Sequence, residues 1–185
     1  MALLSAAVGG GNFVTPLFGC VLDVLLLFFS FRQKEKSRLG KLACFLLMLA
    51  AFVYSMTAPG NAVRGQTLSG GMSAVKAILE SFYFGMALMS RYFSPALAAL
   101  WLATVLLLRE RLIQSRFSFR YPLLAVGVFV CLYCCQLTPT LYTGNYLGDG
   151  RTVNTYFYTF VLLSCALALY WLGWGLRRWE KPGSC

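Results

Sequence analysis

The sequence contains no histidine and few charged residues. Of its 185 residues, 12% are charged and 59% are hydrophobic, and the mean hydropathy is +0.69. A soluble domain carries about 25% charged and 45–50% apolar residues, so these values exclude a soluble enzyme of this size. The lack of histidine removes His-based acid–base catalysis, His metal ligands and Ser-His triads. Because 16% of the residues are aromatic, a disordered chain is also excluded. The composition predicts an all-α integral membrane protein, a bundle of membrane-spanning helices.

Acidic residues are also scarce, with 6 Asp and Glu against 16 Lys and Arg, for a net charge of +10. Most of the cations fall in three short clusters between apolar runs, and no nucleic-acid-binding motif is present, so nucleic acid is not expected as a partner. Such clusters are typical of the cytoplasmic ends of membrane spans, where they attract anionic lipid. The clusters lie within residues 32–41, 109–120 and 177–181.

Five apolar runs approach the roughly 20 residues that a bilayer-crossing helix needs. With five spans the three basic clusters share the cytoplasmic side, which predicts an N-out, C-in topology for a single transmembrane domain over residues 1–185. An additional interfacial helix is predicted near residues 73–90, and Ser94-Pro95 is predicted to start the following span. The predicted spans lie near residues 13–31, 39–58, 92–108, 121–138 and 155–176.

The predicted topology places the amino terminus outside, although the sequence does not open with the charged region of a signal peptide. This combination has two explanations. The first span inserts as a reverse anchor, or the chain is the carboxy-terminal part of a longer polytopic protein. We favour the second, because the first twelve residues carry no charge.

The first predicted outer loop contains Pro59-Gly60-Asn61, a turn sequence, followed by Arg64. The turn explains the proline and glycine completely, and Asn61 in part, because Asn tolerates turns. Arg64 has two interpretations: a solvated cation, or an arginine that binds a carboxylate or phosphate at the membrane boundary.

The second predicted outer loop, residues 139–154, combines glycines with polar and aromatic side chains. Its composition is typical either of a flexible turn or of a surface that binds carbohydrate or phosphate. A third Gly/Asn segment, Gly9–Asn12, falls on the same predicted side, which favours a ligand site there. The candidate ligand-binding residues of the second loop are Tyr142, Asn145, Asp149 and Arg151, and those of the first are Asn61 and Arg64.

Asp23 lies inside the first predicted span, where a carboxylate is costly and indicates either a function or a buried partner. We expect structural pairing, for example with Arg91, in preference to proton transfer. Three of the seven cysteines, Cys131, Cys134 and Cys135, share one helical face. With no His or carboxylate nearby, they are interpreted as small apolar residues and not as a metal or redox site. No cofactor or metal is expected.

Several segments resemble a family of bacterial polytopic membrane proteins of unknown function. The resemblance rests on Ala58-Pro59-Gly60-Asn61-Ala62-Val63-Arg64, on Gly11–Thr15 and on Gly150–Asn154. It covers nearly the whole chain and corresponds to the carboxy-terminal half of that family, which is similar to the GT-C glycosyltransferases that use polyprenyl-phosphate sugars. In those enzymes the acidic catalytic residues lie in a first large outer loop that this sequence lacks.

Two functions follow, and the enzyme assignment is left open. In the first, the chain is part of a membrane glycosyltransferase or surface-polysaccharide assembly protein of the bacterial cytoplasmic (inner) membrane. Arg64 and Arg151 would then hold a lipid-linked phosphate, with Asn61, Asn145 and tyrosines near the sugar. In the second, it is a non-catalytic membrane subunit or a small transporter-like protein that packs against membrane lipid and other subunits through its spans.

Overall fold

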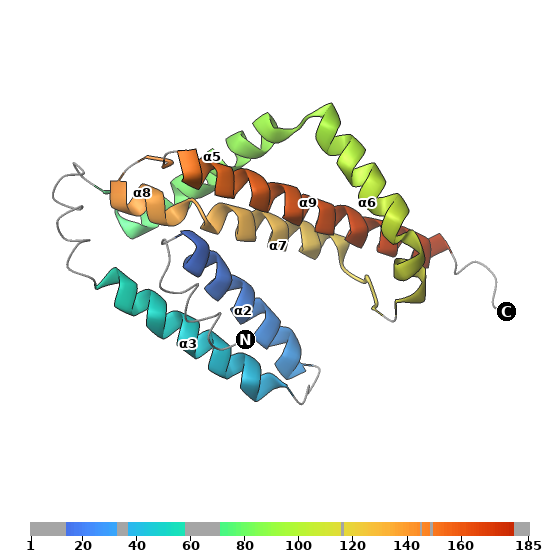
Figure 1. Cartoon of the computed structure of the whole chain (residues 1–185), viewed down its shortest axis with the longest axis horizontal. Coiled ribbons are helices and arrows are strands. Elements are labelled where there is room, and N and C mark those ends of the chain that lie inside the picture. The colour runs from blue at the N-terminus through green and yellow to red at the C-terminus, as the bar shows by residue number, and fades with distance from the viewer. Residues whose placement is uncertain are drawn as a thin grey trace.

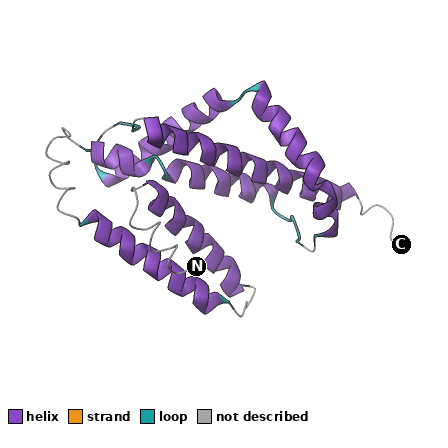
Figure 2. Cartoon of the chain, viewed as in Figure 1, coloured by secondary structure: helices purple, strands orange, loops and turns teal. Residues whose placement is uncertain are grey.

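The computed structural model describes residues 14–32, 37–57, 71–115, 117–144, 146–148 and 150–179. These residues contain helices and no strand, which confirms the predicted all-α class (Figure 2). In chain order, Figure 1 shows α2 (Val14–Arg32), α3 (Arg38–Met56), α5 (Ala74–Tyr92), α6 (Pro95–Gln114), α7 (Pro122–Cys135), α8 (Thr138–Gly144) and α9 (Gly150–Trp179).

The first two helices, α2 and α3, form an antiparallel hairpin (Figure 1). Each is 19 residues long and is bounded on the hairpin side by a cation, Arg32 at the end of α2 and Arg38 at the start of α3. The bounds of both helices agree closely with the predicted spans. An uninterrupted apolar run that is flanked by charged residues determines where the helix begins and ends.

The hairpin is held by close packing and one polar bond. A Cβ at Gly19 would lie 2.7 Å from the Met48 sulfur, so the glycine allows α3 to approach α2. Near the hairpin end, Lys41 Nζ donates a hydrogen bond to Ser30 Oγ at 2.7 Å. The aliphatic stem of Lys41 therefore lies along the hairpin while its charge stays near the helix ends.

Helix α5 packs lengthwise on the bundle. It starts at the N-cap residue Ser73, whose side chain accepts a hydrogen bond from the Lys76 N–H. A Cβ at Gly85 would lie 2.6 Å from Cys134 Sγ, so the glycine permits close packing on α7. A helix thus exists where the interfacial helix was predicted, and its buried face runs along α8 and α7. That face repeats every four residues: Ala77, Ser81, Gly85 and Met89.

The predicted span near residues 92–108 corresponds to helix α6, which starts at Ser94-Pro95 as predicted. The α5 helix continues to Tyr92, Phe93 is extended, and α6 begins at Pro95 with Ser94 as its N-cap. The apolar part of α6 before Arg109 has 14 residues, about 21 Å at 1.5 Å per residue, so it is shorter than the hydrocarbon core of a bilayer. Together, however, α5 and α6 run from one end of the molecule to the other with a bend between them (Figure 1).

The last two predicted spans also differ in their bounds. Residues 139–144, predicted to be outer loop, belong to α8, which follows a two-residue break at Gln136 and Leu137. Pro139 lies in the first turn of α8, where its missing N–H costs no helical hydrogen bond, so it does not end the helix here. Residues 150–154, also predicted to be loop, form the first turn of the 30-residue helix α9.

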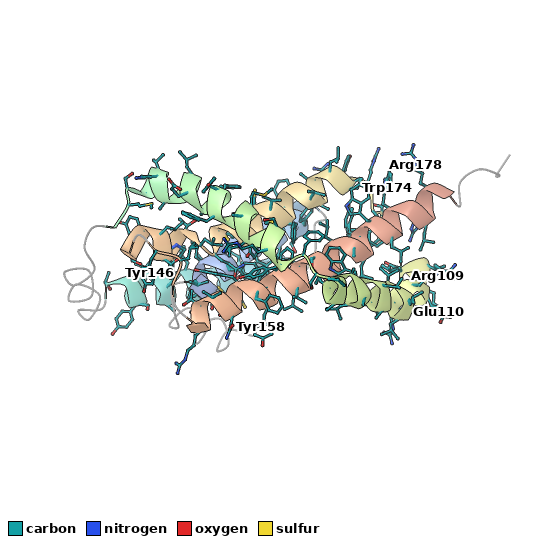
Figure 3. All side chains as sticks on the ribbon, turned by 90° about the horizontal axis from the view of Figure 1, so that it is seen from above. Arg109, Glu110, Tyr146, Tyr158, Trp174 and Arg178 are labelled. Carbon is teal, nitrogen blue, oxygen red and sulfur yellow. The ribbon has the colours of Figure 1, made fainter. Side chains whose placement is uncertain are left out.

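Four helical segments of the described chain are long and apolar enough to cross a membrane. They are Val14–Arg32, Arg38–Ser55, Pro122–Gly144 (α7 with α8) and Gly150–Arg178. The end of α6, the start of α7 and the end of α9 lie toward one end of the molecule, and α8 and the start of α9 lie toward the other (Figure 1). Figure 3 accordingly shows Arg109, Glu110 and Arg178 at one end and Tyr146 at the opposite end.

The core lies where α5, α7, α8 and α9 meet. Its centre is the α7–α8 junction, where Tyr133, Cys134 and Leu137 are fully buried. Aromatic rings fill the space between α5, α7 and α9, with Phe160 contacting the rings of Tyr92 and Tyr133. Most of the fully buried side chains of the described residues thus lie around this junction.

Candidate functional site

The α8–α9 end, which we define as residues 140–144, 146–148 and 150–156, carries the candidate ligand residues that the structure describes. Tyr142 on α8 and Arg151 in the first turn of α9 are both exposed. The other predicted ligand residues, Asn61, Arg64, Asn145 and Asp149, lie outside the described residues, as does the segment Gly9–Asn12. Two of the six candidates are therefore placed, and both are at this end.

Local geometry fixes this end of the bundle. Gly148 has φ of +88°, a conformation that favours glycine, and a Cβ there would also come within 2.9 Å of the Thr152 side chain. This turn immediately precedes α9. In the first turns of α9, Thr155 Oγ1 donates a hydrogen bond to the Arg151 carbonyl oxygen at 3.0 Å. Arg151 thus stands on a fixed first helical turn.

The start of α5 meets the same end. A Cβ at Gly71 would collide with the carbonyl oxygen of Tyr142, so the chain just before α5 passes against the end of α8. The segment that leads out of the first predicted outer loop therefore lies beside Tyr142. This contact agrees with the prediction that the two loops share one side of the protein.

The intramembrane charges are not brought together. The Oδ2 atom of Asp23 is buried on α2 and has no hydrogen-bond partner. Arg91 is exposed in the last turn of α5, so the suggested pair with Asp23 is not formed in this structure. Cys20, one turn before Asp23, is buried on the same helix.

The three cysteines on one face of α7 differ in their exposure to solvent. Cys134 is fully buried against Gly85, Cys131 is exposed, and Cys135 donates to the Leu132 carbonyl. Within the described part of the chain, no group of three or more His, Cys, Asp or Glu residues is arranged to hold a metal ion.

An apolar cavity of about 260 Å³ lies between α5, α6, α7 and α9. One wall is formed at the α5–α6 bend by Phe93 and Trp101, whose rings meet edge to face. The opposite wall includes Phe160 and Ser164 of α9, and Ser164 accepts a hydrogen bond from Trp101 Nε1 at 2.9 Å. Its lining suits a hydrocarbon environment.

The basic end of the molecule is anchored by arginine contacts. Arg177 near the end of α9 donates to the backbone carbonyl of Ser115, just past the end of α6. Arg178 lies over the Trp174 ring at 5.3 Å, and Arg120 over the Tyr121 ring at 5.6 Å. Pairs of an arginine and an aromatic ring are favoured at the membrane–water interface. The amphipathic ring lies at the head-group level while the guanidinium stays hydrated.

Sequence reasoning missed a group of buried polar side chains at the α7–α8 junction. Tyr133 and Gln136 are 0% and 1% exposed, and the buried Tyr156 places its hydroxyl beside Thr140. Gln136, which follows the apolar run of residues 122–135, was the one sequence feature that could have indicated a buried polar group here. Helical position alone cannot show which neighbouring helix covers it.

Comparison of the chain with known protein families, curated proteins and solved structures found no match.

Proposed function

We propose that the protein crosses the bacterial cytoplasmic membrane five times, with its amino terminus outside. The crossings would be α2, α3, the bent pair α5–α6, α7–α8 and α9. The bent pair supports this count, because α6 is short while α5 and α6 together run the length of the bundle (Figure 1). The basic residues at the α2–α3 turn and at the ends of α6 and α9 support a cytoplasmic position for that end.

At the opposite end, the protein would hold the phosphate of a lipid-linked sugar during cell-surface glycan assembly. One observation carries this proposal: Arg151 stands exposed in the first turn of the longest helix, α9. There the free N–H groups and the helix dipole favour an anion, and the guanidinium adds a bidentate donor for phosphate. The exposed Tyr142 and the adjoining chain before α5 would border the same head group.

A second candidate, a membrane subunit that packs through its spans, is favoured by α3. Only 6% of its apolar span is buried, and Tyr54 near its end is 81% exposed. In the described residues α3 packs mainly on α2, so its outer face is available to lipid or to another subunit.

Binding of an anionic polyprenyl lipid to nanodisc-embedded protein tests the phosphate proposal. We expect Arg151→Ala to weaken binding of undecaprenyl phosphate at least tenfold, and Arg151→Lys to recover part of it, because lysine keeps the charge but loses the bidentate geometry. Arg178→Ala is the matched control, since it removes an exposed arginine from the other end of the same helix.

Equal losses for Arg151→Ala and Arg178→Ala would show only general attraction of anionic lipid and would reject the site. An Arg151→Ala variant that binds the lipid as well as the unchanged protein would reject it too. If instead the protein co-purifies with a stoichiometric partner and α3 substitutions such as Tyr54→Ala release it, the subunit function is supported.

A further inference from the structure

One side of helix α6 is exposed along its length. The other side packs on α9, where Trp101 bonds to Ser164 and Thr104 to Cys165. The exposed residues follow one another at spacings of three and four, so they lie one above another on the helix. We call them the outer stripe of α6: Leu100, Ala103, Leu107, Glu110 and Gln114.

The outer stripe changes from apolar to polar along the helix. Leu100 is 43% exposed and Leu107 is 80% exposed, whereas the stripe ends in Glu110 and Gln114. Leu100 and Glu110 are ten positions apart, a rise of about 15 Å, which is half of the roughly 30 Å hydrocarbon core of a bilayer. In the crossing proposed for α5–α6, the apolar part therefore spans the acyl chains of one leaflet, and the polar part reaches its head groups.

A surface hollow of about 440 Å³ lies at the polar end of the outer stripe. It is lined by Glu110, Arg111, Gln114 and Ser115, and Figure 3 shows Glu110 at the end of the molecule opposite Tyr146. Glu110 and Arg111 are adjacent, and adjacent side chains on a helix do not face each other. Neither side chain forms an ion pair with a described residue. Both charges are therefore available to a ligand in the hollow.

The charges around the hollow restrict the ligand that fits it. Arg111 offers a bidentate donor for a phosphate, and Arg177, which donates to the Ser115 carbonyl, adds a second positive charge nearby. The Glu110 carboxylate attracts a cation. The last carbonyls of α6 lack helical N–H partners and carry the negative end of the helix dipole, so a cation that donates hydrogen bonds is favoured. A head group with a phosphate and a primary ammonium meets both requirements.

We propose that the hollow and the outer stripe of α6 bind a phospholipid with a phosphoethanolamine head group. The phosphate bonds to Arg111, the ammonium bonds to Glu110, and an acyl chain lies along Leu107 and Leu100. The inference rests on the proposed membrane crossing by α5–α6. It does not require the lipid-linked sugar site, because Arg151 lies in the first turn of α9.

Native mass spectrometry of the full chain in detergent tests this inference. Phosphatidylethanolamine, phosphatidylcholine and phosphatidylglycerol with identical acyl chains are added in equal amounts, so that only the head group differs. We expect the ethanolamine lipid to bind about tenfold more tightly than the choline lipid, whose quaternary ammonium cannot donate a hydrogen bond. Glu110→Gln should remove that preference and strengthen binding of phosphatidylglycerol. Arg111→Gln should weaken binding of all three lipids.

Glu80→Gln and Arg120→Gln are the matched controls, because each removes one charge of the same sign from outside the hollow. Both should keep the preference for the ethanolamine lipid, and unchanged thermal unfolding midpoints would show that the variants fold.

Three results would overturn the inference. The unchanged protein binds the ethanolamine and choline lipids equally, it binds phosphatidylglycerol best as general attraction by basic residues predicts, or Glu80→Gln loses the preference as Glu110→Gln does. Undecaprenyl phosphate binding at Arg151 is measured separately, so failure of one proposal is distinguishable from failure of the other.

Discussion

The indole nitrogen of Trp101 on α6 donates a hydrogen bond to Ser164 Oγ on α9 at 2.9 Å. Ser164 in turn donates to the carbonyl of Val161 on its own helix. The pair joins residues 63 positions apart and holds the second half of the bent α5–α6 pair against the longest helix.

Ser164→Ala should lower the unfolding midpoint, by the equivalent of about 1–3 kcal/mol, because it leaves a half-buried indole N–H unpaired. Thermal unfolding in detergent, followed by tryptophan fluorescence, measures the change. Ser90→Ala is the control, since Ser90 also donates to a carbonyl three residues back but is exposed on α5. A loss no larger than that of the control would show that the Trp101 bond does not hold α6 in place.

Gly85→Ala should destabilise the packing of α5 on α7, because its Cβ would lie 2.6 Å from Cys134 Sγ. Overpacking of this kind costs about 1–3 kcal/mol. Gly127→Ala, on α7 with nothing within 4 Å, should be neutral or stabilising. Adding Cys134→Ala to the Gly85 variant should restore much of the lost stability, and failure of that rescue would contradict the contact.

Gly148→Ala should disturb the turn into α9, because alanine at φ of +88° is strained and its Cβ would crowd Thr152. We expect a cost of about 1–3 kcal/mol in the same unfolding measurement. Gly150→Ala provides the comparison, since a Cβ there meets nothing within 4 Å. Equal effects of the two substitutions would argue against a special turn at Gly148.

Reporter fusions test the proposed topology. A fluorescent protein fused after Trp179 should fluoresce, and alkaline phosphatase at the same point should be inactive, because that end is expected in the cytoplasm. Phosphatase inserted between α3 and α5 should be active. Activity of both phosphatase fusions would eliminate the five-crossing arrangement and favour four crossings by the segments that are each long enough alone.

The predicted spans of α2 and α3 could be read closely from the sequence, because each is an apolar run ended by charge at Arg32 or Arg38. The division of residues 74–114 into two helices could be predicted as well, because Ser94-Pro95 is typical of a helix start. The bounds of the helices after residue 121 could not be read from apolar content. The outer loop was predicted to begin at Pro139, which instead lies in the first turn of α8.

Part of the candidate site could likewise be predicted from the sequence and part could not. Arg151 and Tyr142 were found as polar residues in a glycine-rich stretch, and the structure places both at the α8–α9 end. The buried polar side chains at the α7–α8 junction were missed, because spacing within one helix does not show which neighbouring helix covers them.

Composition and charge placement alone were enough to establish a helical, apolar protein with its cations gathered between the spans, because the cost of burying charge in hydrocarbon dominates those patterns. Only tertiary packing decided that α5 lies along α7, that Tyr156 turns inward to Thr140, and that Tyr133 and Gln136 are fully enclosed. These depend on which helices meet across large sequence separations, and periodicity within one helix carries no information about that choice.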